Sequence, residues 1–166
     1  MTKRRFLLAL LLTFVSVTHA GDLQPYTAGA ATPALKLRDL DNKEHDLSQY
    51  RGQVVLVQFW ATYCTPCRKE MPSMNKMMTK MGKTPFKILA VNMGETEEEV
   101  KTFVNEVKPA FTILMDPVGN SIADWRVFAA PSNFIIGPDG KIRYTLFGGV
   151  EWDSDALVAQ LKAIAK

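Results

Sequence analysis

Residues 54–60 are the part of the sequence that most limits the possible folds. The run is almost entirely apolar and is bounded by turn-forming residues, which is typical of a strand buried on both faces. We therefore expect it to lie in the centre of a sheet. The two cysteines of the chain, Cys64 and Cys67, follow this strand almost directly.

The cysteine pair has little value as a structural staple. A disulfide between Cys64 and Cys67 closes a very short loop and so constrains the unfolded chain little. Exported proteins usually pair cysteines over long distances, but the sequence contains no third cysteine. A C-x-x-C motif between a buried strand and a helix is a strong indication of thiol redox chemistry.

The predicted helix from Pro66 to about Met81 makes the two cysteines unequal. Pro66 suits the first helical position, so Cys64 lies at the helix N-terminus, where the helix dipole favours a thiolate. Arg68 and the neighbouring Lys69 are close in sequence and are expected to favour it further. Cys67, one turn on, can donate a hydrogen bond to Cys64. We therefore expect Cys64 to be the nucleophile and Cys67 the resolving thiol.

Apolar periodicity and turn signals predict the remaining elements. A capping box at Thr96 and Glu99 opens one of the helices. Strands are expected at 35–40, 44–47, 86–92, 112–115, 133–136 and 141–147, and helical segments at 48–50, 96–107, 122–125 and from 153 or 154 to 165. Strands that alternate with helices and end in a hairpin predict an α/β domain with a mixed sheet.

The N-terminus has the pattern of an export signal. A basic stretch at 3–5 precedes an apolar run at 6–17, which is too short to span a bilayer comfortably. Small residues up to Ala20 suit a cleavage site. Residues 1–20 therefore predict a signal peptide, and an uncleaved N-terminal anchor is the alternative.

The rest of the chain is expected to form one domain. The small and polar residues of 21–33 predict a flexible leader, and 34–166 is long enough to bury a sizeable core. The whole chain carries a net charge of +3. All of that excess lies within 1–20, so the remainder is neutral and gives no indication of a nucleic-acid partner.

Several segments together resemble the thioredoxin-fold thiol–disulfide oxidoreductases, and among them the exported TlpA/ResA-like family. The active-site segment is 59–72, and the supporting matches are 35–47, 51–57, 130–136 and 139–142. The resemblance implies a thioredoxin-like fold with a central mixed β-sheet flanked by helices. It also implies an N-terminal β-hairpin extension.

The resemblance also implies roles for individual residues. Pro131 would form a cis peptide bond, and Ala130 before it would offer backbone hydrogen bonds to an extended substrate. Trp60 would border the active site and contact the substrate. Glu70 matches an active-site glutamate, which would accept a proton near Cys67. A solvated charge on the helix surface remains the alternative for this glutamate.

Two positions depart from the wider superfamily. Gln58 stands where thioredoxins carry a buried aspartate, and because an amide cannot titrate, a proton shuttle at that position is not expected. Tyr63 replaces the tryptophan that commonly precedes the first cysteine. It keeps an aromatic side chain beside the site and adds a hydroxyl group.

We expect no metal and no cofactor beyond the redox-active disulfide between Cys64 and Cys67. A zinc site would need two further ligands, and the only histidines are His19 and His45. Methionines at helical spacing suggest either a copper(I) site or a helix face packed on the sheet, and we favour the packed face. These methionines are Met71, Met74, Met78 and Met81.

The expected function is an exported thiol–disulfide oxidoreductase that reduces protein disulfides through Cys64 and Cys67. It would act as a monomer, in the periplasm or membrane-associated on the extracytoplasmic side. Its partners would be disulfide-containing client proteins, with a role in cytochrome c maturation or in the maintenance of metalloprotein thiols. The resemblance implies a membrane thiol-transfer protein of the DsbD or CcdA kind as electron donor.

Three other functions remain open. A disulfide oxidase or isomerase would use the same fold in another redox direction. A copper-binding or chaperone-like module would use the two cysteines as ligands. A peroxidase is expected less, because the sequence lacks the proline and threonine that frame a single peroxidatic cysteine.

Overall fold

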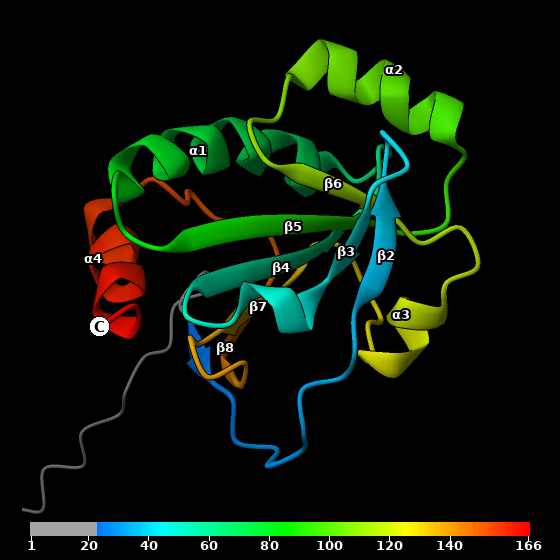
Figure 1. Cartoon of the computed structure of the whole chain (residues 1–166). Coiled ribbons are helices and arrows are strands. Elements are labelled where there is room, and N and C mark those ends of the chain that lie inside the picture. Colours follow the sequence, from blue (N-terminus) through cyan, green and yellow to red (C-terminus); the bar gives the residue numbers. More distant parts are fainter. Residues whose placement is uncertain (1–22) are drawn as a thin grey trace, which may run out of the picture.

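The computed structural model describes residues 23–166, and the predicted signal peptide at 1–20 lies outside them. Within the described part, eight strands form one sheet in the order β1-β8-β7-β4-β5-β6-β2-β3, with helices packed on it (Figure 1). The strands are β1 (Gln24–Pro25), β2 (Lys36–Asp39), β3 (Glu44–Asp46), β4 (Val54–Trp60), β5 (Phe86–Asn92), β6 (Thr112–Met115), β7 (Ser132–Ile136) and β8 (Ile142–Phe147). The helical segments are η1 (Leu47–Tyr50), α1 (Thr65–Met81), α2 (Glu97–Val107), α3 (Asn120–Asp124) and α4 (Asp155–Ile164).

β4 is a central strand, as the sequence predicts. It pairs in parallel with β5 and antiparallel with β7, and every one of its residues is buried. Leu56 and Trp60 belong to the core under α1, α2 and α4, whereas Val57 and Phe59 belong to the core under α3 and η1. The apolar run thus serves both faces of a mixed sheet, which confirms the expected fold class.

The methionines of α1 form a core face rather than a solvent-exposed stripe. Met71, Met74 and Met81 are buried as expected. Met77 is also fully buried, whereas Met78 is only partly so. Flexible thioether side chains fill the irregular space between α1 and the sheet.

β2 and β3 pair antiparallel, and β2 also pairs with β6. His45 on β3 is buried between two polar partners: Nε2 lies 2.7 Å from Asp39 Oδ2, and Nδ1 lies 2.6 Å from the Tyr50 hydroxyl. These contacts fix β2, β3 and η1 to one another at one edge of the sheet.

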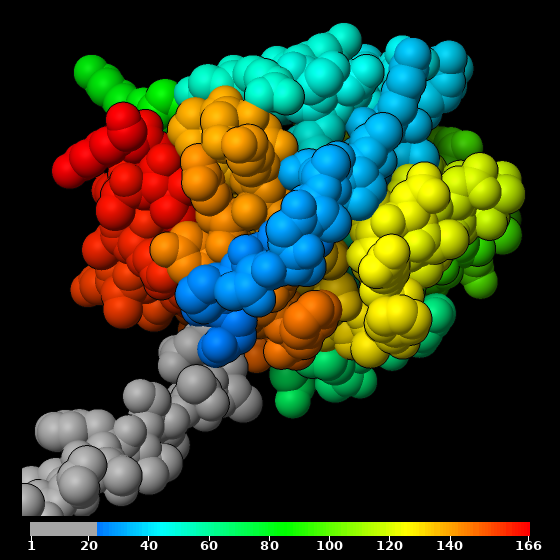
Figure 2. Space-filling view, turned by 90° about the horizontal axis from the view of Figure 1, so that it is seen from below, coloured from blue at the N-terminus to red at the C-terminus, as the bar shows by residue number. Residues whose placement is uncertain are grey.

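The segment expected to be a flexible leader contains a short strand. Gln24 and Pro25 form β1, which pairs with β8, and Leu23 before them is buried. Farther on, Thr32 Oγ1 accepts a hydrogen bond of 3.1 Å from the backbone N–H of Ile142. Figure 2 shows this part of the chain lying against the segment that contains β7 and β8. The sequence of 21–33 has no clear strand pattern, because this short strand is held by hydrogen bonds to the edge of β8 rather than by its own apolar residues.

Between residues 23 and 166, none of the helices has both the length and the apolar character that crossing a membrane would require.

Candidate functional site

The turn between β4 and α1 positions the two cysteines. Cys64 is the N-cap residue of α1, and its sulfur accepts a hydrogen bond of 3.2 Å from the Cys67 backbone N–H. Pro66 lies in the first turn, where its missing N–H removes no helical hydrogen bond. Cys64 and Cys67 are joined by a disulfide, with their Cα atoms 5.3 Å apart.

The two cysteines differ in exposure. Cys64 keeps 8% of its surface exposed, whereas Cys67 is 0% exposed. A protein that approaches this disulfide can therefore reach Cys64 but not Cys67.

Glu70 lies one helical turn after Cys67 and points into the protein. It is almost fully buried, so the alternative of a solvated surface charge is wrong. Its carboxylate accepts hydrogen bonds from Gln58 Nε2, from the Val150 backbone N–H at 3.2 Å and from Trp152 Nε1 at 3.3 Å. Burial outweighs these hydrogen bonds and raises the pKa of Glu70 to about 7. Glu70 can therefore gain or lose a proton near neutral pH.

The proline segment and the cysteine turn meet through two glycines. The Ala130–Pro131 peptide bond is cis, as expected. The Pro131 carbonyl accepts a hydrogen bond of 3.0 Å from the Gly148 N–H. At Gly149, an added Cβ would lie 3.0 Å from Pro66 Cβ, so a side chain here would press on the first turn of α1. The end of β8 thus links Pro131 to the turn that carries the disulfide.

Three large aromatic side chains near these segments are exposed. Tyr63 directly precedes Cys64 and is 77% exposed, and Phe128 lies three residues before Pro131 and is 94% exposed. Phe147, which precedes the first of the two glycines, is 65% exposed. Large exposed aromatic side chains often contribute to protein interaction sites, and these three are close in sequence to the disulfide, to Pro131 and to the two glycines.

The expectation for Arg68 is not supported by its contacts. Its guanidinium forms an ion pair of 2.6 Å with Glu106 and lies 4.8 Å from the centre of the Phe103 ring. It also donates to the Thr62 carbonyl at 3.5 Å. The long arginine side chain reaches these partners on α2 although its backbone lies close to Cys64. Arg68 is therefore engaged by α2 rather than held at the Cys64 sulfur.

The expectation for Trp60 also needs correction. Its side chain is fully buried and its ring centre lies 4.8 Å from that of Phe103. A residue without exposed surface cannot contact a substrate in this conformation. Trp60 supports the site from beneath, as part of the core between β4 and α2.

Glu95 is a site residue that the sequence did not reveal. Its carboxylate accepts hydrogen bonds from the Thr62 backbone N–H at 2.7 Å, from the Thr62 hydroxyl and from Asn92 Nδ2 at 2.6 Å. It therefore fixes the chain just before Cys64. The available signal was the position of Asn92, which pairs in register with Trp60 at the same end of the sheet.

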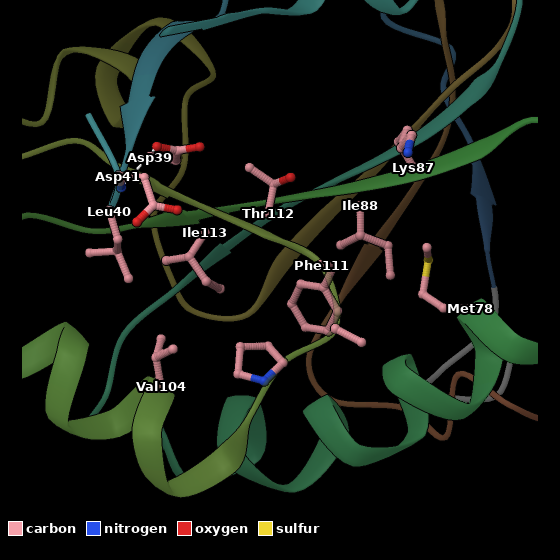
Figure 3. A pocket seen from close by; sticks show the side chains of 12 residues that line it. Asp39, Leu40, Asp41, Met78, Lys87, Ile88, Val104, Phe111, Thr112 and Ile113 are labelled. Atoms are coloured by element: carbon pink, nitrogen blue, oxygen red, sulfur yellow. Dashed lines mark hydrogen bonds between the residues drawn. The ribbon is translucent and has the colours of Figure 1, made fainter. Parts of the chain in front are cut away.

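A hollow of about 260 Å³ lies beside the disulfide. It is lined by Pro66, Lys69, Glu70, Gly149, Val150 and Glu151. Another hollow, of about 370 Å³, is lined by residues of β2, β5, β6, α1, α2 and the loops beside them, among them Ile88, Val104 and Phe111 (Figure 3). It shares no residue with the cysteine turn, so the first hollow belongs to the candidate site and the second does not.

A disulfide in which only one cysteine keeps exposed surface, at the start of a helix that also carries a buried carboxyl group, suits thiol–disulfide exchange. Known proteins agree with this chemistry. The AhpC/TSA family matches residues 28–145. The thiol-disulfide oxidoreductase ResA of Geobacillus thermodenitrificans (strain NG80-2) is 35% identical over 149 residues, which are 87% of this chain and 86% of that protein. The chain belongs to the ResA-like thiol-disulfide oxidoreductases of this family.

Other ResA-like proteins agree in sequence and in fold. ResA of Bacillus subtilis (strain 168) is 31% identical over 134 residues, which are 81% of this chain and 74% of that protein. A putative thiol:disulfide interchange protein DsbE from Chlorobium tepidum has a TM-score of 0.75 and 29% identity, covering 88% of this chain and 99% of the solved one. The thioredoxin-like fold and the class of enzyme, a thiol-disulfide oxidoreductase, are thereby confirmed.

Proposed function

We propose that this ResA-like protein reduces disulfides in exported client proteins, with Cys64 as the attacking and Cys67 as the resolving thiol. The observation that carries the proposal is the difference in exposure between the two cysteines. Because only Cys64 has exposed surface, a client disulfide meets this cysteine first.

The reaction proceeds in two exchange steps. The Cys64 thiolate attacks one client sulfur, and the other client sulfur leaves as a thiolate and takes up a proton. The Cys67 thiolate then attacks the Cys64 sulfur in the mixed disulfide and releases the second client thiolate, which is also protonated. Two electrons and two protons pass to the client, and Cys64 and Cys67 end as the disulfide.

Two features of the surroundings favour reduction over oxidation. A strongly oxidising pair such as that of DsbA has a stabilised reduced form, which goes with a low thiol pKa. Here the guanidinium of Arg68 is engaged by Glu106, and the Glu70 carboxyl group is buried on the same helix. A nearby carboxylate disfavours a thiolate, so the reduced pair is not stabilised as it is in a strong oxidant.

Glu70 supplies the proton acceptor for Cys67. The two residues are three positions apart on α1 and both face the core, where water cannot take the proton directly. With a pKa of about 7, Glu70 can accept the Cys67 proton and give it up again.

The client binds as an extended segment beside the disulfide. Ala130 offers backbone hydrogen bonds ahead of cis-Pro131. The exposed rings of Tyr63, Phe128 and Phe147 provide apolar contacts around it. The clients are disulfide-containing proteins of the extracytoplasmic space, such as apocytochrome c or a metalloprotein with ligand cysteines.

The pattern at 1–20 supports export, and the proposed protein works in the periplasm or at the outer face of a membrane. Because each turnover leaves the disulfide, a membrane thiol-transfer protein of the DsbD or CcdA kind would restore the dithiol. We propose that the protein acts as a monomer.

Trapping tests the proposal directly. A Cys67→Ala variant, expressed with its own N-terminus in the native compartment, should accumulate mixed disulfides between Cys64 and client proteins. Non-reducing gels and mass spectrometry would identify them, and a Cys64→Ala, Cys67→Ala variant is the matched control. If the two variants retain the same proteins, protein disulfide exchange at Cys64 is excluded.

The direction of exchange needs a second measurement. A potential as high as that of DsbA, about −120 mV, would contradict the reductive role and favour an oxidase. Copper titration of the reduced protein and an assay of peroxide consumption would detect the copper-binding and peroxidase alternatives.

A further inference from the structure

Gln58 has an unusual environment in the centre of β4. Its side chain is fully buried and faces α1. The amide Nε2 donates to Glu70 Oε1 and also lies 3.3 Å from Met74 Sδ. The amide oxygen Oε1 is buried and has no hydrogen-bond partner among the described residues. Buried polar atoms are nearly always paired, so this oxygen needs an explanation.

The contacts of Glu70 suit only its ionised form. Gln58 Nε2, the Val150 N–H and Trp152 Nε1 are all donors. A protonated Glu70 must itself donate a hydrogen bond and therefore needs an acceptor. Gln58 Oε1 becomes that acceptor when the amide turns by about 180°, since this rotation exchanges its oxygen and nitrogen.

Asn133 on β7 provides a partner for the turned amide. It lies directly opposite Gln58 in the antiparallel register, so the two side chains share one face of the sheet with their Cβ atoms about 5 Å apart. Asn133 is fully buried, and its Nδ2 donates to the Leu146 carbonyl at 3.3 Å. Its Oδ1 is a second buried oxygen with no partner among the described residues.

We propose that Gln58 is a positioning residue whose side-chain amide turns over when Glu70 takes up a proton. In the turned state the Glu70 O–H donates to Gln58 Oε1, and Gln58 Nε2 donates to Asn133 Oδ1. Both oxygens that lack a partner beside ionised Glu70 are then paired. The cost of protonating a carboxyl group that is surrounded by donors is thereby reduced.

This inference rests on the proposed function for the source of the proton, which Glu70 receives from Cys67 in that proposal. The Cys67 S–H bond breaks, a Glu70 O–H bond forms, and no electron changes place. Gln58 does not carry the proton. It stabilises the carboxyl group both before and after the transfer, which a fixed donor or a fixed acceptor could do in only one state.

Other charged groups lie near Glu70 in the described part of the chain. Lys69 from α1 and Glu151 from the loop before α4 line the same hollow as Glu70, and Asp153 follows in that loop. Cys67 does not titrate in the disulfide form. The oxidised protein is therefore the suitable form for a titration of Glu70 without interference from the thiols.

The test is an NMR titration of the oxidised full-length protein between pH 5 and 9, which follows the Glu70 carboxyl carbon and the Gln58 side-chain amide. We expect both signals to change with one midpoint near 7. Asn133→Val should lower the pKa of Glu70 by about one half to one pH unit, because the protonated state loses one hydrogen bond. Ile135→Val, which trims a buried side chain on the same face of the same strand, is the control and should leave it unchanged.

A double variant distinguishes rotation of the Gln58 amide from a general loosening of the core. In a Gln58→Met background, Asn133→Val should no longer change the pKa of Glu70, since the connecting amide is gone. The inference is overturned if the Gln58 amide signals stay constant while wild-type Glu70 titrates, or if Asn133→Val leaves that pKa unchanged. Neither result depends on a client, so the titration and the trapping experiment can fail independently.

Discussion

Glu70 makes the stability of the protein sensitive to pH through a single carboxyl group. Burial raises its pKa from an ordinary value of 4.5 to about 7 in the folded protein. Between these two values the folded state binds more protons than the unfolded state. The free energy of unfolding therefore falls as pH rises through this window and levels off above it.

Replacing Glu70 with Gln should remove this dependence. From pH 5 to pH 8 the wild-type protein should lose about 2 to 3 kcal/mol more unfolding free energy than Glu70→Gln. Urea unfolding of the oxidised proteins at the two pH values measures the difference. Glu97→Gln, an exposed change on α2, is the control and should follow the wild type. Parallel pH profiles for wild type and Glu70→Gln would show that the buried carboxyl group is not the cause.

The exposed ring of Phe128 is expected to contact the client in the proposed function. Phe128→Ser should raise KM for a protein client several-fold through the loss of apolar contact, with little change in kcat. The rate with a small disulfide such as oxidised dithiothreitol should stay the same, since it does not reach the ring. Phe128→Tyr should restore client binding. Equal losses with both substrates would place the effect at the disulfide instead.

At the level of elements, one carboxylate holds together two loops at the same end of the sheet. Glu95 lies between β5 and α2, and it binds both Asn92 at the end of β5 and Thr62 between β4 and α1. The turn that carries Cys64 is therefore fixed by a neighbouring crossover as well as by its own helix.

Glu95→Ala should loosen this turn. The Thr62 N–H and the Asn92 amide lose their acceptor, so we expect a loss of about 1 to 3 kcal/mol in unfolding free energy. Slower reaction of Cys64 with client disulfides should accompany it. Glu98→Ala, on the exposed first turn of α2, should change unfolding free energy by no more than about 0.5 kcal/mol. Denaturant unfolding and stopped-flow exchange kinetics measure the two effects.

Most elements could be predicted because their signals are local. The apolar run of β4, the capping box at Thr96 and the serine cap at Ser154 each lie within one turn or strand of what they determine. Glu70 was harder, although Cys67, Met71 and Met74 at helical spacing place it on the buried face. That stripe was available in the sequence.

Other parts of the site depended on contacts across the fold. Arg68 finds Glu106 on another helix, and Glu70 finds Trp152 far along the chain. Neither pairing follows from the spacing of residues in the sequence. The role of Gln58 could not be predicted for the same reason, because it depends on contacts with the Glu70 carboxyl group on α1 and on the position of Asn133 on the neighbouring strand.

For the whole molecule, the proposed direction of exchange has a consequence for stability. A reductant is a protein whose folded state favours the disulfide over the dithiol, the reverse of DsbA. The Cys64–Cys67 loop is so short that chain entropy contributes only about 2 kcal/mol to this preference. The remaining free energy that favours the disulfide in the folded state must come from the residues around Cys64 and Cys67.

The oxidised protein should therefore melt above the reduced one. We expect Tm to fall by roughly 4 to 8 °C when the disulfide is reduced. Differential scanning calorimetry with and without a phosphine reductant measures this, and the Cys64→Ala, Cys67→Ala variant corrects for any other effect of the reagent. A higher Tm for the reduced protein would indicate an oxidase.

The two outer strands of the sheet, β1 and β3, are short, which matters for a protein proposed to bind unfolded client chains. β1 has only two residues and one of them, Pro25, has no N–H to offer, while β3 has only three residues. Such short edges give little template for strand addition, which is a common route to aggregation. An extended client of the proposed reductase would therefore find little of the sheet edge to pair with. In the proposed reductase, short edge strands would leave few backbone groups on which client chains could assemble.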